Sequence, residues 1–456
     1  MYSVITVSVA ILIIAAAFYA SKKIPQSKFF VFQKVLAVAY FVFGIVRMFL
    51  RDSFVEEITD FADPYQTFLR WFAYISYSTY IMATFFDSRL FKNIAVCFSL
   101  PVSLLSVISF EGTFKYFLSD AGEGFVIDLA TRYGFYIIEL AVSVAIPVLF
   151  ILCNKHIPSY KNRGEILRLV TVLPVILLFV MPAYIPQALL GSTEISTKSF
   201  GPMHFAWIAV MIAACIVFHL VFKNKSYNDR YMLCLFIALT ELIHTHQVFL
   251  RGFTVSRLPL QLCCISGFFY VFALATKNRK FFDFCYLANT LGAVIAIALA
   301  SYSEGALTFW NIHYMQEHGY VLILPILTMS LHVFPRINIT AIKHTLLIFC
   351  CYFFSCFIIG TLINGLSATE GYAVNYFYMF NHAVALEYLP FVGFTGVIHW
   401  QFGSFGIYPI LVLLIFVVFS TLFVAFYFFT RLIYKISDKI QASKKSNSDI
   451  DILTTV

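Results

Sequence analysis

The chain has 456 residues, of which 61% are hydrophobic and 18% aromatic but only 12% charged, and its mean hydropathy is +0.86. This composition excludes a soluble globular protein and is typical of a polytopic membrane protein. The formal net charge of +8 would suggest a nucleic-acid partner in a soluble chain. Here Lys and Arg concentrate in short loops between apolar segments, a pattern that sets membrane orientation, so we expect no nucleic acid.

About thirteen apolar segments are long enough to span a bilayer, judged against the roughly 20 apolar residues that a spanning helix needs. Their approximate limits are 3–20, 32–50, 68–86, 92–110, 124–153, 165–190, 204–222, 231–250, 258–276, 281–301, 307–333, 341–364 and 406–434. The first segment lacks a preceding basic region and is interpreted as a retained helix rather than a cleaved signal peptide. The sequence therefore predicts an all-α, multi-pass protein of the cell membrane.

Basic residues recur in alternate loops, which predicts the orientation of the chain. The basic loops and tail contain Lys22, Lys23, Lys28, Arg89, Lys92, Lys155, Lys161, Arg163, Arg168, Lys223, Lys225, Arg230, Lys277, Arg279, Lys280, Arg336, Lys343, Arg431, Lys435, Lys439, Lys444 and Lys445. The other loops are acidic or neutral, and they include Glu56, Glu57, Asp60, Asp63, Glu111, Asp120, Glu123, Glu304 and Glu370. We expect an extracytoplasmic N-terminus and a cytoplasmic C-terminus.

Short sequences recur in the same helix order in the two halves of the chain. The pairs are 49–51 with 249–251, 75–76 with 265–266, 83–84 with 275–276, 111–112 with 304–305, and 133–134 with 318–319. We interpret them as two parallel six-helix repeats followed by a thirteenth helix. The expected parts are a degenerate N-terminal repeat over 1–200, a C-terminal unit over 201–436 and a polar cytoplasmic tail over 437–456.

A thiol and an imidazole in apolar segments are the main candidates for chemistry, because a polar group in hydrocarbon is usually functional. Cys263 lies near the outer end of the ninth segment, and His318 lies in the eleventh. An imidazole that takes the proton of a thiol leaves a reactive thiolate, which can carry an acyl group as a thioester. Ala73 and Tyr133 occupy the corresponding positions of the first repeat, so only the C-terminal unit has this pair. The plainer alternative is a small buried thiol and a histidine that bonds a neighbouring helix.

The C-terminal half resembles a known family over roughly residues 204 to 434. The resemblance rests on the run Leu258-Pro259-Leu260-Gln261-Leu262-Cys263, on His318-Gly319 and on Asn375-Tyr376. These motifs are similar to those of the YwaF-like integral membrane proteins and their eukaryotic relatives, the transmembrane protein 164 family. The family motif reads Pro-Leu-His-Leu-Cys, so Gln261 stands where a His is usual. The resemblance implies a cysteine-dependent acyltransferase that remodels ether-linked phospholipids, with Cys263 as nucleophile and His318 as base. Shorter family members lack the N-terminal repeat.

Further polar residues are expected near the pair. Glu241 and His244 lie at i and i+3 of the eighth segment, and His313 and Glu317 lie at i and i+4 of the eleventh. Glu241, ahead of Glu317, is the predicted orienter of the imidazole, and Gln261 or His244 is a candidate oxyanion donor. The alternative is a buried hydrogen-bond network between helices. The set Glu241, His244, His246 and His318 lacks a recognised metal spacing, so we expect neither metal nor cofactor.

The connection between about 365 and 405 is long and aromatic, and loops of this length are usually functional. Its polar residues are candidates for a lid that admits a lipid: Asn375, Tyr376, Asn381 and His382. The alternative is an aromatic anchor at the membrane surface.

Two functions therefore remain. The first is a membrane-embedded acyltransferase or lipid hydrolase that acts on phospholipids or glycolipids at the extracytoplasmic leaflet. Cys264 is its alternative nucleophile, but on a helix its side chain would point about 100° away from Cys263. The second is a lipid or small-molecule transporter or flippase, which the repeat and the intramembrane Arg47, Glu139 and Glu241 favour. A transporter needs no reactive thiol, so thiol dependence separates the two.

Overall fold

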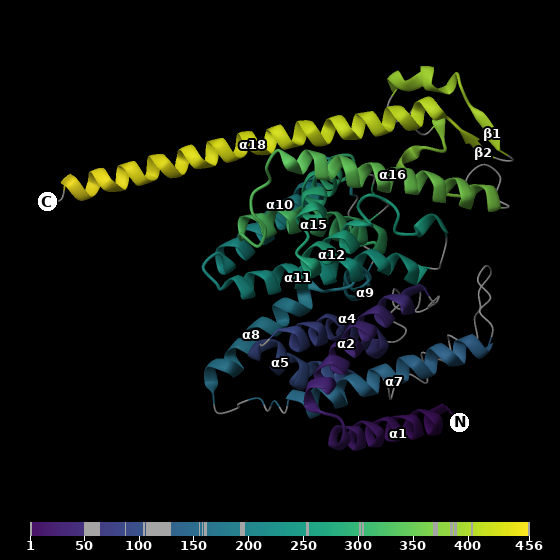
Figure 1. Cartoon of the computed structure of the whole chain (residues 1–456), viewed down its shortest axis with the longest axis vertical. Coiled ribbons are helices and arrows are strands. Elements are labelled where there is room, and N and C mark those ends of the chain that lie inside the picture. The colour runs from purple at the N-terminus through teal and green to yellow at the C-terminus, as the bar shows by residue number, and fades with distance from the viewer. Residues whose placement is uncertain are drawn as a thin grey trace. The chain divides into compact units, whose positions relative to one another are not determined.

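The computed structural model consists almost entirely of helices (Figure 1). It describes residues 2–49, 64–86, 88–103, 105, 129–154, 156, 158, 162–191, 197–251, 255–300, 302, 305–367, 373–383, 386, 390–402 and 405–454. The predicted acidic loops at 56–63 and 111–123, together with Glu304 and Glu370, lie outside the described residues. The side chains of Arg47, Tyr133 and Glu139 do so as well.

The chain divides by packing into two compact units. Unit 1 comprises Met1–Pro259 and Ala298–Tyr320, and unit 2 comprises Leu260–Ile297 and Val321–Val456. Helix α15 (Phe309–Ser330) contributes its first part to unit 1 and its second part to unit 2. This division by packing does not coincide with the repeat boundary near residue 200, which stays a prediction.

Unit 1 contains most of the N-terminal helices of the chain. They are α1 (Tyr2–Lys23), α2 (Gln26–Phe49), α4 (Pro64–Phe85), α5 (Arg89–Ile94), the π-helix η1 (Ala95–Ser99), α7 (Leu129–Asn154), α8 (Arg163–Phe179), α9 (Ile185–Leu190), α10 (Pro202–Phe222), α11 (Tyr227–His246) and the 3₁₀ turns η2 (Gln247–Arg251) and η3 (Val255–Arg257). Helix α11 forms the core of this unit, because every residue from Cys234 to His246 is buried. By contrast, α10 is apolar on all sides and almost wholly exposed, as a helix that faces lipid should be.

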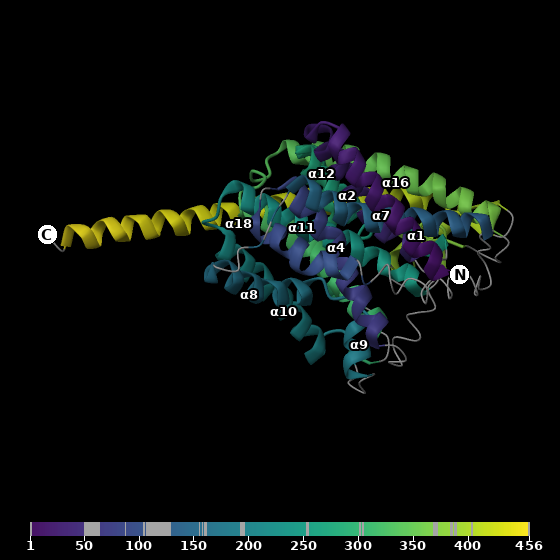
Figure 2. The same cartoon turned by 90° about the horizontal axis from the view of Figure 1, so that it is seen from below.

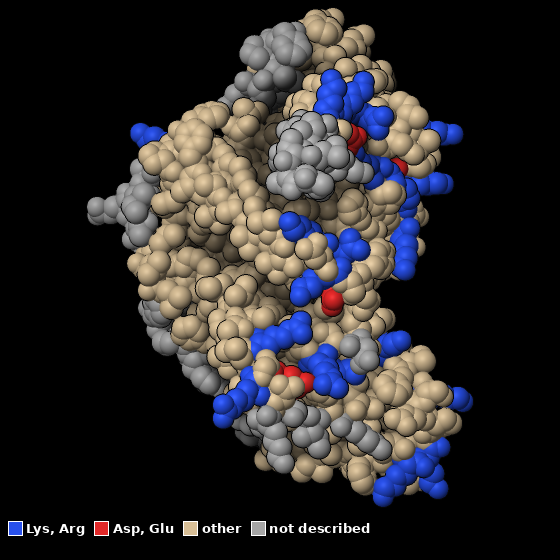
Figure 3. Space-filling view, turned by 90° about the vertical axis from the view of Figure 1, so that its left-hand side faces the viewer, with Lys and Arg blue, Asp and Glu red and all other residues tan. Residues whose placement is uncertain are grey.

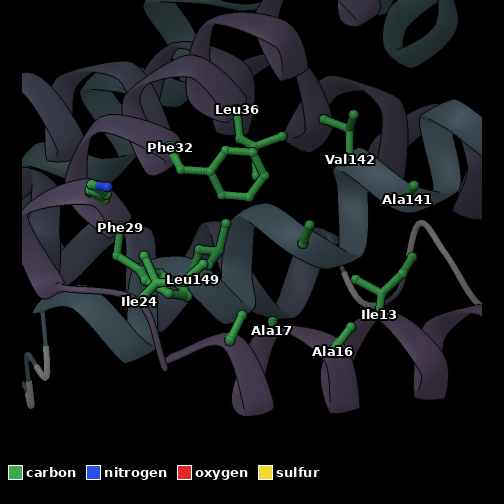
Figure 4. A pocket seen from close by; sticks show the side chains of 13 residues that line it. Ile13, Ala16, Ala17, Ile24, Phe29, Phe32, Leu36, Ala141, Val142 and Leu149 are labelled. Carbon is green, nitrogen blue, oxygen red and sulfur yellow. The ribbon is translucent and has the colours of Figure 1, made fainter. Parts of the chain in front are cut away.

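The N-terminal helices α1, α2 and α7 pack around an apolar cavity of about 600 Å³. Phe29 and Leu149 form its buried edge, and small residues such as Ala16 and Ala17 line the α1 side (Figure 4). The small side chains of α1 explain the space, since they do not fill the gap to α2 and α7.

Unit 2 contains α12 (Ser266–Thr276), α13 (Arg279–Phe284), the π-helix η4 (Cys285–Asn289), α14 (Thr290–Ala298), α16 (Thr340–Leu366), the 3₁₀ turns η5 (Tyr376–Tyr378) and η6 (Pro390–Gly396), and α18 (Pro409–Thr454). A short antiparallel hairpin, β1 (Trp400–Phe402) and β2 (Phe405–Ile407), places Trp400 opposite Ile407 just before α18. Aromatic rings fill the core: Phe349 of α16 stacks on Phe416 of α18 with centroids 5.5 Å apart.

The two π-helical segments occupy corresponding places in the sequence. Each follows a six-residue helix that begins with arginine, Arg89 in α5 and Arg279 in α13. Each is five residues long, and the second begins 190 positions after the first, at residues 95 and 285. A π-helical turn is rare and depends on packing as well as sequence. Its recurrence is therefore a structural likeness between the halves of the chain in addition to the recurring dipeptides.

Six helices among the described residues are long and apolar enough to cross a membrane. The chain is a multi-pass, all-α membrane protein, as predicted. Within the described residues, helices also occupy the other expected segments, with three clear departures from the expected limits. The sixth breaks after Phe179, and the ninth begins only at Ser266. The last continues as α18 to Thr454, and this long helix is seen in Figures 1 and 2. With eleven residues, α12 alone is too short to span, because a helix rises about 1.5 Å per residue.

Candidate functional site

Cys263 does not lie inside a helix, contrary to the interpretation of the ninth segment. Residues 262–265 form a turn, and α12 begins at Ser266, three positions after the cysteine. The backbone N–H of Ser266 donates to the carbonyl oxygen of Cys263 over 3.1 Å. Cys263 therefore comes directly before the N-terminal end of α12, and its carbonyl accepts one of the N–H groups at that end. The turn also means that the helical angle of 100° does not separate Cys263 from Cys264.

Three side chains of unit 2 fix the backbone around this turn. The Tyr352 hydroxyl and the Cys356 thiol of α16 both donate to the carbonyl oxygen of Leu260, over 2.6 and 3.5 Å. The amide Nδ2 of Asn289, at the end of the π-helix η4, donates to the carbonyl oxygen of Leu262 over 3.0 Å. These carbonyls lie outside a helical ladder, so a membrane environment requires such partners. The turn that carries Cys263 is therefore held from two sides.

Gly292 of α14 allows the turn to approach closely. A Cβ atom at this position would lie 3.1 Å from the side chain of Leu262 and 3.9 Å from the sulfur of Cys263. The glycine thus leaves room for the turn, and it places the cysteine sulfur against the backbone of α14.

Asn289 should control the position of Cys263. It is completely buried, and its Oδ1 has no partner among the described residues. Replacing it by leucine leaves the Leu262 carbonyl without its donor, a loss of about 1–3 kcal/mol in the free energy of unfolding. We expect the Asn289→Leu chain to modify Cys263 more slowly with a small alkylating reagent. Thr290→Val, which removes a neighbouring hydroxyl, is the control, and equal alkylation rates in all three chains would contradict the role.

His318 lies on α15 in unit 1 and is 7% exposed. Its Nδ1 lies 2.7 Å from the carbonyl oxygen of Tyr314, one turn earlier, and the two rings lie 4.2 Å apart. A carbonyl oxygen only accepts, so Nδ1 carries the proton and donates it. The neutral ring then has its lone pair on Nε2, which is the form that a general base requires. At Nδ1 the orienting group is thus a backbone carbonyl, while the predicted role of Glu241 stays untested.

Gly319 fits α15 against α10. A Cβ atom there would lie 3.2 to 3.3 Å from the side chain of Met211, which is tighter than usual. The glycine of the His318-Gly319 dipeptide therefore serves packing next to the imidazole.

The break after α8 creates backbone groups that three side chains satisfy. The Tyr320 hydroxyl donates to the carbonyl of Phe179, the Gln316 amide donates to the carbonyl of Met181 over 3.0 Å, and Gln247 Oε1 accepts from the N–H of Ala183 over 2.9 Å. A broken helix at membrane depth is tolerated only with such partners.

Gln247 also determines which ring nitrogen of His244 carries the proton. Because Oε1 of Gln247 binds Ala183, its Nε2 faces His244 and donates to Nδ1 over 3.1 Å. The His244 ring stacks on Tyr320 with centroids 5.1 Å apart. With Nδ1 accepting, the proton of neutral His244 is on Nε2. This histidine is suited to donate a hydrogen bond rather than to act as a base.

The remaining acidic candidates are buried in unit 1. Glu317 Oε2 lies 3.7 Å from His313 Nε2, so it faces His313 as the i and i+4 spacing predicts. Glu241 is fully buried on α11. No group of three or more His, Cys, Asp or Glu residues in the described part of the chain is arranged to hold a metal ion.

The comparison with protein families gives one match. The model of the TMEM164 family matches residues 199–427. The chain belongs to the TMEM164 family. No curated protein and no solved structure matches it. The matched range includes Cys263, His318 and the fixed turn, whereas α1 to α9 precede it.

In this TMEM164-family chain the predicted lid folds onto α16 of unit 2. Asn364 of α16 holds the start of this segment, because its Oδ1 accepts hydrogen bonds from the N–H groups of Ala373 and Val374 over 2.8 and 2.9 Å. Tyr376 is fully buried, and burial raises the pKa of its phenol to about 12, so it stays protonated at neutral pH. A Cβ on Gly360 would clash with Phe380 at 2.5 Å, so this close packing requires glycine.

The other lid candidates hold turns within the same segment. Asn375 Oδ1 accepts from the N–H of Phe380 over 2.9 Å. His382 Nε2 lies 3.1 Å from the Thr395 hydroxyl, and its ring stacks on Tyr408. Asn381 is half-buried. Phe377 and Tyr378 have φ values of 53° and 61°, an unfavourable conformation for bulky residues that the packing of the segment must maintain.

Gln261 has an exposed side chain, and its carbonyl accepts from the N–H of Ile265 over 3.0 Å. The residues that sequence reasoning missed are those that position the others: Asn289, Gly292, Gln316, Tyr320, Tyr352 and Cys356. A signal existed for Asn289, because an asparagine in an apolar segment is as unusual as the candidates that were chosen.

Proposed function

We propose that this TMEM164-family protein is a cysteine-dependent acyltransferase that remodels phospholipids or glycolipids at the extracytoplasmic leaflet through a thioester on Cys263. The observation that carries the proposal is the fixed turn: a thiol at the N-terminal end of α12, held through Leu260 and Leu262 by buried side chains. Family membership supports the proposal.

The proposed reaction has two balanced steps. His318 Nε2 takes the proton of the Cys263 thiol, and the thiolate attacks the carbonyl carbon of a lipid ester. The carbon–oxygen bond breaks, the lysolipid leaves with the proton from the imidazolium, and the acyl group stays on sulfur. In the second step the hydroxyl of another lysolipid gives its proton to His318 and attacks the thioester, which restores the thiol. With water as acceptor the same steps release a fatty acid.

The negative charge that develops on the carbonyl oxygen needs hydrogen-bond donors. The first N–H groups of a helix have no partner within the helix and point toward its N-terminal end. In our proposal those of α12 after Ser266, whose own N–H already donates to the carbonyl of Cys263, stabilise the oxyanion. Gln261 and His244 remain alternatives, and His244 carries its proton on Nε2 as a donor must.

We infer for the whole chain two parallel six-helix repeats and a thirteenth helix, with an extracytoplasmic N-terminus and a cytoplasmic C-terminus. The recurring π-helices η1 and η4 support the duplication. In this proposal the first repeat has no chemistry of its own, because Ala73 and Tyr133 replace the cysteine and histidine.

Intact mass spectrometry tests the proposal directly. We expect purified protein incubated with bacterial phospholipid to gain the mass of one acyl chain. The adduct should map to the peptide with Cys263 and be released by neutral hydroxylamine, which cleaves thioesters. An adduct on Cys264 would reassign the nucleophile, and a protein that never gains the mass would contradict the reaction.

A transporter or flippase is the second candidate, favoured by the break between α8 and α9 and the duplication. Such broken helices often border transport sites. Lipid transport that is indifferent to loss of the Cys263 thiol would favour this function.

A further inference from the structure

A second cavity of unit 1 is lined by α5, α8, α10 and α11, and its volume is about 680 Å³. This volume is typical of sites for small molecules, which measure roughly 300–1,000 Å³. Its floor is buried and apolar and consists of Phe91, Ile176, Met232 and Phe236. Its lip is exposed and equally apolar and consists of Val175, Val217 and Val221. In a multi-pass membrane protein such a lip faces lipid tails, so an acyl chain is the natural occupant.

Aromatic rings make up one part of the lining. Phe179, the last residue of α8, packs edge to face against Phe218 of α10 with centroids 5.4 Å apart. It also packs against Phe236 of α11 at 6.4 Å. These contacts join α8, α10 and α11 at one point. The cavity is therefore a shaped space rather than an open gap beside the exposed α10.

Charged residues in the lining lie close to the ends of the same helices. Arg168 lies near the start of α8, Lys225 follows α10, and Asp229 lies in the first turn of α11. Asp229 accepts a hydrogen bond from the Ser226 hydroxyl over 2.7 Å and lies at the helix end that favours an anion. Arg168 and Lys225 form no ion pair with any residue that the structure describes.

The acidic residue nearest in sequence to Arg168 is already paired. Glu165, three positions earlier on α8, binds Arg89 over 3.0 Å. Arg168 and Lys225 thus remain available to an external anion. On the face shown in Figure 3, Lys and Arg form groups on an otherwise uncharged surface, and few carboxylates lie among them.

We propose that this cavity binds one phospholipid with an anionic headgroup, with an acyl chain between α8, α10 and α11 and the phosphate at Arg168 and Lys225. Basic pockets at the ends of membrane helices select anionic headgroups in this way. The lipid belongs to the leaflet at which these two side chains lie, the cytoplasmic one in the orientation proposed above. The site is separate from the reaction at Cys263. The cavity between α1, α2 and α7 has Lys28 as its one charged lining residue, so it offers no comparable pair of cations.

Native mass spectrometry of the full chain in detergent tests the site with phosphatidylglycerol and phosphatidylcholine of identical acyl chains. We expect one phosphatidylglycerol to be retained in preference to phosphatidylcholine. The double variant Arg168→Ala/Lys225→Ala should bind phosphatidylglycerol roughly tenfold or more weakly, because each cation near a lipid surface contributes about 1 kcal/mol. The matched control is Arg163→Ala/Lys223→Ala, which removes the same charge from the same helix ends but not from the cavity.

A third variant tests the apolar part. Val217→Trp adds volume at an exposed position of the lip, where folding should tolerate it, and should weaken retention of the lipid while both cations remain. Equal retention of the two lipids would overturn the proposal, and so would equal losses in the two double variants. A loss confined to Arg168→Ala/Lys225→Ala and Val217→Trp would establish the site. Acyl transfer at Cys263 is measured separately, so failure of either proposal leaves the other testable.

Discussion

Replacing Cys263 by alanine is expected to abolish formation of the acyl adduct and to lower acyl transfer by roughly 10³-fold or more, because covalent catalysis loses its nucleophile. The substitution removes one sulfur atom from a half-buried position and leaves the donors to Leu260 and Leu262 in place. The chain should therefore fold normally, as gel filtration and thermal unfolding will verify. Turnover is measured with a labelled phospholipid donor and an unlabelled lysolipid acceptor.

Cys264→Ala is the matched control, because it removes the adjacent thiol from the same turn. We expect it to retain activity within a few-fold of the wild type. If the two substitutions have equal effects, the thiol of Cys263 has no special role. If Cys264→Ala alone inactivates, the nucleophile is the neighbouring residue, an outcome that the turn geometry allows and a helix would have opposed.

Hydropathy predicted the class of the fold because a spanning segment must satisfy its backbone within itself, which leaves helices as the solution. For this reason α2, α10, α16 and most other helices occur where the sequence placed them. The limits of α12 could not be predicted in the same way. Residues 258–265 are mostly apolar, and Pro259 is a local sign of a break, but the partners that fix the turn at 262–265 lie far along the chain.

Tyr352 and Cys356 illustrate the difficulty. They lie about ninety positions after Leu260, whose carbonyl they bind, and nothing in their spacing reveals the contact. The π-helix η4, which follows α13 and ends at Asn289, could not be predicted either, because hydropathy does not distinguish an α-turn from a π-turn. The candidates themselves were found because thiols and imidazoles are rare in apolar segments. Their supporting backbone was not found, because it depends on tertiary contacts.

The break after α8 could be predicted in part. Pro182 and Pro186 follow Phe179 within one apolar run, and prolines so placed interrupt a helix. These prolines therefore predict the break, whereas the side chains that bind its free backbone groups could not be predicted from the sequence. Gln247, Gln316 and Tyr320 come from other helices, so their polar atoms look unexplained until the break is known.

Replacing His318 by alanine is expected to slow formation of the thioester by roughly 10²- to 10⁴-fold, the usual contribution of a general base. The hydrogen bond from Nδ1 to Tyr314 lies within one turn of α15, so its loss should leave the helix intact. The rate of adduct formation is measured by intact mass spectrometry at fixed pH. His219→Ala on α10 is the control for loss of a histidine from an apolar helix, and it should react like the wild type.

Added imidazole separates a base from a structural residue. In His318→Ala the missing ring leaves space beside Tyr314, so free imidazole should enter and restore part of the rate in proportion to its concentration. His318→Gln fills most of that space with an amide that cannot accept a proton, and imidazole should not rescue it. If His318→Ala reacts at the wild-type rate, the thiolate forms without this histidine.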